Sequence, residues 1–159
     1  MSFQLTSSAF ADGEEIPISH TCEGEDVSPL LRWTEPPEGT RSLALIVDDP
    51  DAPDPKAPRM TWVHWVVLGL PAGAGSLPEG VAQEALPGAG RFGRNDWKHA
   101  EYGGPCPPIG RHRYFHKLYA LDVELAELKT PTKSELLEAM EGHVLAHTEL
   151  VGTYQKQAP

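Results

Sequence analysis

Three acidic residues and two prolines share the segment Asp48-Asp49-Pro50-Asp51-Ala52-Pro53, directly after a run of apolar residues. The apolar run predicts a strand, and the prolines predict a rigid turn that presents carboxylates at the strand end. An X-Pro bond in such a turn can be cis. A solvated acidic turn is the ordinary alternative. We expect Asp51 to hold the loop by pairing with Arg113.

A histidine stands inside the apolar segment Trp62-Val63-His64-Trp65-Val66-Val67. The alternation of a strand predicts that Trp62, His64 and Val66 lie on one face and the other three residues on the opposite face. Burial of His64 would favour its neutral form. A histidine in such a strand is more often a core residue with satisfied hydrogen bonds than a ligand.

The segment 102–114 is rich in glycine and proline and leads into a further strand. Glycine allows close backbone approach and positive φ, and proline fixes a loop before any ligand binds. His112 and Tyr114 should share one strand face, with Arg113 on the other. This pattern predicts a preorganised wall with an imidazole and a phenol directed into one cavity. A rigid surface loop with a solvated histidine is the alternative.

If the fold brings the three segments together, Asp49, His64 and His112 could line one small polar pocket for an anion. An anion beside Asp49 requires a shared proton, a histidinium or backbone N–H groups. We expect one phosphate oxygen to accept from a histidine, another to share a proton with Asp49, and Tyr114 to donate its hydroxyl. Phosphate affinity should then rise as pH falls from about 7 towards about 5, through the reference pKa of histidine.

The same three residues, Asp49, His64 and His112, could instead serve an enzyme. They could form a two-His-one-carboxylate metal site or the acid–base pair of a hydrolase or cyclase. No serine or cysteine nucleophile is recognisable by motif beside them. A binding module without catalysis, metal or cofactor is therefore the preferred interpretation. An interaction protein that acts through exposed loops is a third interpretation and has no separate signature.

The 15 glycines and 16 prolines lie mainly between apolar runs, which predicts short strands joined by long loops. Ser42 to Val47 and Thr61 to Leu68 are nearly continuously apolar, as expected of central strands buried on both faces. The other predicted strands are Phe3 to Ala9, Leu30 to Trp33, Tyr114 to Val123 and Glu149 to Tyr154. The segments 71–80 and 87–93 lack periodicity and are predicted to be irregular.

One helix is predicted near the C-terminus. Thr132-Lys133-Ser134-Glu135 has the pattern of a capping box, and Gly142 is expected to kink or end the helix. The helical spacing of apolar residues continues through Leu136, Leu137, Met140, Val144 and Leu145. The chain is therefore predicted to be one mainly β domain over residues 1–159, with one or two short helices near its end.

The formal charge of −10, from 13 Lys and Arg against 23 Asp and Glu, repels phosphate backbones and argues against a nucleic-acid partner. A basic-apolar leader and an unbroken apolar span are both lacking in the sequence, which predicts a cytoplasmic, non-membrane protein. Cys22 and Cys106 match no Cys-x-x-Cys spacing, and a reduced, structural pair is the expected state. A disulfide or a reactive site at the pocket is the alternative.

The order of the motifs carries a family resemblance. Asp-Pro-Asp-Ala-Pro at 49–53, Trp-x-His-Trp at 62–65 and Gly-Pro-x-Pro-Pro-x-Gly-x-His-Arg-Tyr at 104–114 resemble the phosphatidylethanolamine-binding protein family, also called Raf-kinase-inhibitor-like proteins. Thr21-Cys22-Glu23-Gly24 and Asn95-Asp96-Trp97 are similar to its bacterial and archaeal branch. The resemblance implies a β-sandwich with a large central antiparallel-rich sheet and a pocket for phosphate, acetate or a phospho-headgroup. It also implies a regulated partner such as a kinase or protease, and it allows a homodimer.

Position by position, the resemblance assigns ligand binding to Asp49, Asp51, Trp62, His64, Gly104, Pro105, His112 and Tyr114. Cys106-Pro107-Pro108 departs from the mammalian pattern, so the rim it forms does not carry over in detail. Trp97 is expected to pack a loop near the pocket rim. Surface or helix-face positions are expected for His20, His99, His116, His143 and His147.

Overall fold

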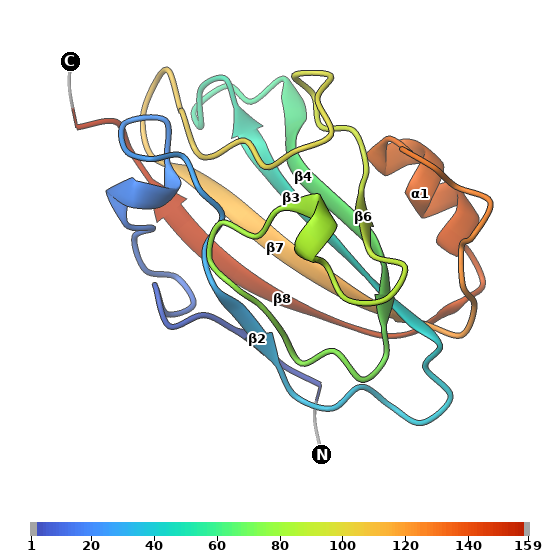
Figure 1. Ribbon diagram of the computed structural model, residues 1–159. Coiled ribbons are helices and arrows are strands. Elements are labelled where there is room, and N and C mark those ends of the chain that lie inside the picture. The colour runs from blue at the N-terminus through green and yellow to red at the C-terminus, as the bar shows by residue number, and fades with distance from the viewer. Residues whose placement is uncertain (1–2, 158–159) are drawn as a thin grey trace.

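The computed structural model describes residues 3–157, and its largest element is a five-stranded antiparallel sheet. The strands of this sheet are β3 (Ser42–Ala52), β4 (Met60–Pro71), β6 (Arg91–Phe92), β7 (His112–Leu121) and β8 (Val144–Tyr154). They lie in the order β6-β4-β3-β7-β8 (Figure 1). A smaller antiparallel sheet has the order β1-β2-β5 and consists of β1 (Leu5–Thr6), β2 (Leu31–Trp33) and β5 (Ser76–Leu77).

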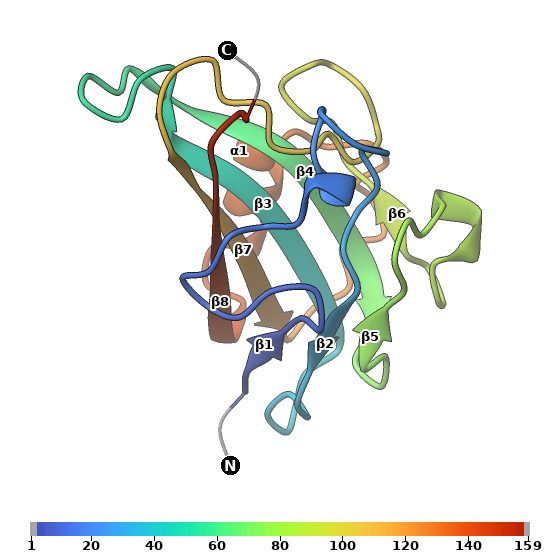
Figure 2. The same ribbon diagram turned by 90° about the vertical axis from the view of Figure 1, so that its left-hand side faces the viewer.

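The large sheet is covered on both faces. Figure 2 shows β1, β2 and β5 in front of it and the helix α1 (Lys133–Met140) behind it. Leu45 and Trp65 belong to the core on the side of the small sheet, whereas Ile46 packs with Leu136 and Met140 of the helix. Because consecutive residues of β3 enter different cores, this strand is apolar along most of its length. The prediction of central strands buried on both faces is confirmed.

The helix begins as the capping box predicts. The Thr132 hydroxyl accepts from the Glu135 N–H at 3.2 Å, and the Glu135 carboxylate accepts from the Thr132 N–H at 2.9 Å. The helix ends at Met140, and Gly142 follows with a φ of +81°. Among the helices of residues 3–157, none has the length and apolar character to cross a bilayer.

Two predictions about element boundaries are wrong. Val144 and Leu145 belong to β8 and not to the helix, because ten of the eleven residues of β8 pair along β7 and this pairing overrides the helical spacing. The segments predicted to be irregular contain the two-residue strands β5 and β6, which are too short to show alternation. Two 3-10 turns, η1 (Ile18–His20) and η2 (Gln83–Ala85), lie in loops far from the C-terminus.

The alternation predicted for β4 breaks at His64. Asp48 pairs with Val63 and Val47 pairs with Trp65, so His64 is an extra residue opposite β3 and forms a β-bulge. Beyond the bulge the faces exchange, and Val66 packs on the helix side instead of sharing a face with His64. The predicted placement of Val66 is therefore wrong, because a period of two cannot anticipate an inserted residue.

Candidate functional site

A cavity of about 550 Å³ opens where the end of β3 meets the beginnings of β4 and β7. Loops around residues 22–26 and 95–108 close its sides. Its lining includes six of the eight predicted ligand-binding residues: Asp49, Trp62, His64, Gly104, His112 and Tyr114. The other two, Asp51 and Pro105, do not belong to the lining. The three sequence motifs therefore meet at one place in the fold.

In the acidic segment, the Asp49 carboxylate lines the cavity and the Asp51 carboxylate holds the loop in place. Asp49 Oδ1 accepts from the Asp51 N–H at 2.7 Å. The Asp51 carboxylate turns to Arg113, which donates to it through Nε at 2.9 Å and Nη2 at 2.8 Å, as expected of a residue that holds the loop. These charge-assisted hydrogen bonds lower the pKa of Asp51. The Ala52–Pro53 peptide bond that follows is cis.

Asp49 and His112 share a proton in the floor of the cavity. His112 Nδ1 lies 2.6 Å from Asp49 Oδ2, and His112 Nε2 lies 2.9 Å from the Ile109 carbonyl and 3.1 Å from that of Pro53. Since carbonyl oxygens only accept, Nε2 must carry a hydrogen. Burial raises the pKa of Asp49, and the hydrogen bond from His112 opposes this shift. With one further proton between Nδ1 and Oδ2, the pair as a whole is neutral.

His64 presents an acceptor to the cavity and not a positive charge. Its Nδ1 donates to the Gly103 carbonyl at 2.7 Å, so in the neutral ring Nε2 has a free electron pair. Burial lowers the pKa of His64 to about 4, partly offset by the hydrogen bond to Gly103. The prediction that His64 stays neutral agrees with this environment. The alternative expectation, that His64 binds an anion as an imidazolium near neutral pH, does not agree with it.

Two residues that line the cavity have buried hydrogen-bond donors without an acceptor from residues 3–157. These donors are the hydroxyl of Tyr114 and the indole N–H of Trp62. Tyr114 is only 1 % exposed, and burial together with the Asp49 carboxylate raises the pKa of its hydroxyl. Tyr114 therefore stays protonated and can donate. Buried donors of this kind are costly unless they are paired, which marks the position as one suited to an acceptor-bearing ligand.

Trp97 forms an aromatic edge at the mouth of the cavity. The Asn95 side chain holds its loop by accepting from the N–H groups of Trp97 and His99, at 3.0 and 3.1 Å. The Trp97 ring stands nearly perpendicular to Trp62 and to His64, with centroids 5.6 and 5.0 Å away. The expectation that Trp97 packs a loop at the rim is confirmed.

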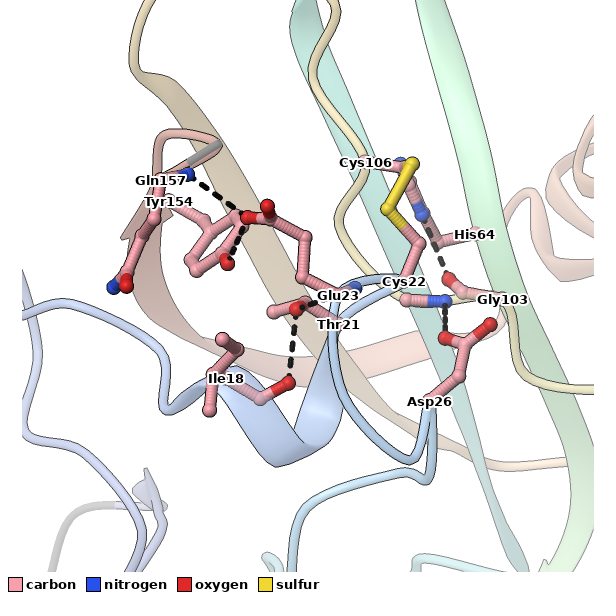
Figure 3. The surroundings of a disulfide bond; sticks show 11 residues. Ile18, Thr21, Cys22, Glu23, Asp26, His64, Gly103, Cys106, Tyr154 and Gln157 are labelled. Carbon is pink, nitrogen blue, oxygen red and sulfur yellow. Dashed lines mark hydrogen bonds between the residues drawn. A yellow bond between two sulfur atoms is a disulfide. The ribbon is translucent and has the colours of Figure 1, made fainter. Parts of the chain in front are cut away.

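The glycine- and proline-rich loop forms a further wall of the cavity. Gly104 N–H donates to Asp26 Oδ1 at 2.8 Å, and a Cβ at position 104 would overlap both this carboxylate and the His20 carbonyl. Only glycine fits so close an approach. Figure 3 shows Cys22 and Cys106 joined by a disulfide next to Gly103 and Asp26. The prediction of a reduced pair is wrong, because the fold brings two cysteines that are 84 residues apart in sequence into direct contact.

The cavity contains no strong cation. Its lining within residues 3–157 includes Asp26, Asp49 and Glu101 but neither lysine nor arginine. No group of three His, Cys, Asp or Glu side chains in this part of the chain is arranged to hold a metal ion. The arrangement therefore offers neutral donors, one neutral acceptor at His64 and a neutral Asp49–His112 pair.

Sequence reasoning missed several lining residues. Asp26, Asn95 and His99 all line the cavity, although none belongs to the three motifs that predicted it, and Cys22 was placed at the pocket only as an alternative. The segments Thr21-Cys22-Glu23-Gly24 and Asn95-Asp96-Trp97 were available as signals, since both carry the family resemblance. The predicted surface placement of His20 and His116 is wrong, because both residues are buried. His116 lies 5.4 Å from the Phe10 ring, and burial lowers its pKa to about 4.

The fold and cavity define a mainly β protein of two antiparallel sheets with a ligand-sized cavity at the end of the larger sheet. Comparisons with known proteins sharpen this class. The family model described as phosphatidylethanolamine-binding protein matches residues 6–155. The chain belongs to the phosphatidylethanolamine-binding protein family.

Individual relatives agree with this assignment. A protein from Methanothermobacter thermautotrophicus, known only as a UPF0098 protein, is 45 % identical, with 96 % of this chain and 98 % of the relative aligned. The crystal structure of a phosphatidylethanolamine-binding protein homologue from Chlamydia trachomatis superposes with a TM-score of 0.89 at 41 % identity, covering 98 % and 99 % of the two chains. E. coli YbcL, described as a member of the mammalian family, has a TM-score of 0.86 at 33 % identity over 99 % of this chain and all of its own.

Proposed function

We propose that the cavity binds a phosphomonoester or a similar small oxyanion in its singly protonated form, and that the protein acts as a binding module. The observation that carries this proposal is that two residues of the cavity lining, Tyr114 and Trp62, hold buried donors without a partner among residues 3–157, next to the neutral His64 acceptor. A monoanionic phosphate group has both features that these residues require. Its oxygens accept from Tyr114 and Trp62, and its P–OH donates to His64 Nε2.

Charge supports the protonated form of the ligand. The cavity has three carboxylates and no lysine or arginine among its described lining residues, so a dianion would meet repulsion. The neutral Asp49–His112 pair adds no positive charge to attract one. A phosphomonoester has a second pKa near 6, so a monoanion is available at mildly acidic to neutral pH.

A binding role is preferred over the enzymatic alternative because the residues of that alternative are already engaged. Both ring nitrogens of His112 face acceptors of the protein itself, and both oxygens of Asp49 accept hydrogen bonds. Neither group is free to move a proton to or from a ligand. A hydrolase or cyclase would need at least one of them.

A regulated protein, such as a kinase or a protease, would reach the bound ligand across the rim of the cavity. Met60, Trp97 and Ile109 are between 39 and 55 % exposed there, which offers apolar contact area. A homodimer through another face remains compatible with this arrangement. The cytoplasmic location predicted from the sequence belongs to the same proposal.

The test is the substitution Tyr114→Phe, with phosphoethanolamine and inorganic phosphate as probes in titration calorimetry at pH 6. Loss of the hydroxyl should weaken binding about tenfold, because a charge-assisted hydrogen bond to the ligand disappears. Protein stability should stay the same or rise, since a buried unpaired donor is removed.

Tyr119→Phe is the matched control. Tyr119 lies on the same strand as Tyr114 but packs on the helix side of the sheet, away from the cavity. Its substitution should leave both affinities unchanged. Unchanged affinity in Tyr114→Phe, or no binding of either probe to the unsubstituted protein, would contradict the proposed function.

A further inference from the structure

The Cys22–Cys106 disulfide separates two hollows. Both cysteines line the ligand cavity, and both line a second hollow of about 590 Å³ on its other side, together with Glu23 and Lys156. Cys22 is exposed and Cys106 is half-buried. A thiol in solution can therefore reach the sulfur atoms without prior opening of the core, which is the condition for exchange.

The disulfide joins the two loops that form the wall of the ligand cavity. Three hydrogen bonds cross between these loops: Cys22 N–H to the Pro105 carbonyl at 3.1 Å, Gly104 N–H to Asp26 Oδ1 at 2.8 Å, and the Tyr102 hydroxyl to the His20 carbonyl at 2.8 Å. The sequence contains only two cysteines, so this bond is the single disulfide the chain can form within itself.

The wall tied by this disulfide also orients the ligand-binding residues. The Gly103 carbonyl fixes the ring of His64 through the 2.7 Å hydrogen bond at Nδ1, and Figure 3 shows this bond next to the disulfide. Gly103 also lies against the Trp97 ring, since a Cβ at position 103 would overlap it. Movement of the wall would therefore disturb both His64 and Trp97.

We propose that Cys22–Cys106 is a thiol–disulfide exchange site at which a dithiol reductant opens the wall of the ligand cavity. One thiolate of the reductant attacks one protein sulfur and forms a mixed disulfide, and the other protein sulfur leaves as a thiolate. The second thiol of the reductant then displaces the attached protein sulfur. The protein gains two electrons and two protons as two thiols, and the reductant becomes a disulfide.

Without the covalent constraint, the three crossing hydrogen bonds alone tie the wall, and these can break and re-form. We expect the wall to sample open conformations, so that His64 is no longer held in one orientation. Ligand affinity should fall about tenfold, because ordering the wall then opposes binding. This consequence for affinity rests on the proposed function, whereas the opening of the wall does not.

The second hollow is lined by one charged side chain of each sign, Glu23 and Lys156. A cation such as Lys156 beside an entering thiolate stabilises both the thiolate and an acidic reductant. Glutathione is a monothiol tripeptide of net negative charge, so two molecules of it attack in succession. It should therefore reduce the disulfide of the unsubstituted protein faster than that of Lys156→Glu. The expected difference is about two- to fivefold at low ionic strength. Lys129→Glu, at a residue outside this hollow, makes the same charge change and should have no effect.

The experiment uses the intact protein, oxidised or treated with dithiothreitol, with the thiols counted by alkylation and mass spectrometry. Acrylamide quenching of tryptophan fluorescence reports on the wall, and circular dichroism reports on the fold. We expect two thiols, an unchanged fold, and increased quenching that is absent in Trp97→Phe. The double variant Cys22→Ser/Cys106→Ser should behave like the reduced protein without any reductant. Phosphoethanolamine affinity, measured in parallel, should fall on reduction.

Each outcome decides the proposal. A bond that resists dithiothreitol unless the protein is unfolded overturns it, as does global unfolding on reduction. Unchanged quenching also overturns it, and so does equal affinity of the oxidised and reduced forms for phosphoethanolamine. If the oxidised protein binds no phosphoethanolamine, the proposed function fails, and the quenching result alone then supports or overturns the exchange site.

Discussion

Asp48 and Asp49 are neighbours in the chain and have opposite surroundings. Asp48 points to the helix side of the sheet, where Lys133 and Lys117 lie 2.6 and 3.2 Å from its Oδ2 atom. Asp49 points into the cavity, where its partner is the imidazole of His112. Both carboxylates are almost fully buried, at 1 and 3 % exposure. Only Asp48 is neutralised by permanent cations.

This difference separates a structural carboxylate from one suited to ligand binding. The two lysines tie β7 and the first residue of α1 to β3, and such an ion pair is useful for positioning the helix. A fixed cation in the cavity would hold an anion tightly but would also pair with the carboxylates there. The neutral Asp49–His112 pair instead leaves the ligand to supply the missing hydrogen-bond partners.

The largest expected effect is acid destabilisation by two buried histidines, His64 at the cavity and His116 next to Phe10. Burial lowers the pKa values of His64 and His116 from 6.5 to about 4. The unfolded chain therefore binds protons first as pH falls, so the stability these groups contribute is complete above pH 6.5 and is lost towards pH 4. The loss should reach about 3 kcal/mol for each histidine, partly offset by protonation of Asp49, whose pKa is raised.

Urea unfolding at half-unit steps between pH 4 and 7 measures this loss. His116→Gln should remove about half of the slope, because glutamine does not titrate. His147→Gln is the control, since His147 is exposed on β8 and its removal should leave the slope unchanged. A free energy of unfolding that is constant over this range would contradict the assignment of neutral, buried histidines.

The next effect compares the two aspartates directly. Asp48→Asn should lower the free energy of unfolding by about 2–3 kcal/mol, because two partly buried lysines lose their counter-ion. Asp49→Asn should cost less than about 1 kcal/mol, because burial already favours the neutral carboxyl and an amide can still bond to His112. Urea titration at pH 7 tests both variants. Equal losses would show that Asp49 is an ion pair of the same kind as Asp48.

The sequence predicted the parts of the fold that depend on local chemistry. The capping box at Thr132, the apolar central strands and the pairing of Asp51 with Arg113 all follow from the properties of those residues and their immediate neighbours. The meeting of three motifs in one cavity came from the family resemblance. No single segment was specific enough to predict it.

The features that the sequence did not predict depend on residues far apart in the chain. The bulge at His64 is defined only by its register against β3, and the disulfide depends on two loops 84 residues apart. The charge of the histidines in the cavity was also predicted wrongly. A histidine beside an acid suggested a positive charge, whereas the structure occupies both nitrogens of His112 and buries His64.

The smallest expected effect concerns the protonation state of the ligand, and it separates two explanations of the same trend. If the cavity selects the monoanion, phosphoethanolamine affinity should fall about fivefold between pH 6 and 7, because the phosphomonoester loses its second proton with a pKa near 6. If an imidazolium bound the anion, the affinity would instead increase only towards pH 4, where His64 titrates. Calorimetry in two buffers of different ionisation enthalpy should show uptake of nearly one proton per ligand at pH 7.

Sulfate provides the control for this last prediction, since it resembles phosphate in shape but has no proton to donate to His64 Nε2 near neutral pH. It should bind more weakly than phosphate, with an affinity that does not change between pH 5.5 and 7. Sulfate binding as tight as that of phosphate would mean that the cavity recognises negative charge alone. Asp49 would then need a cationic partner, as Asp48 has. The two aspartates would differ in their location in the fold but not in the type of ion pair they form.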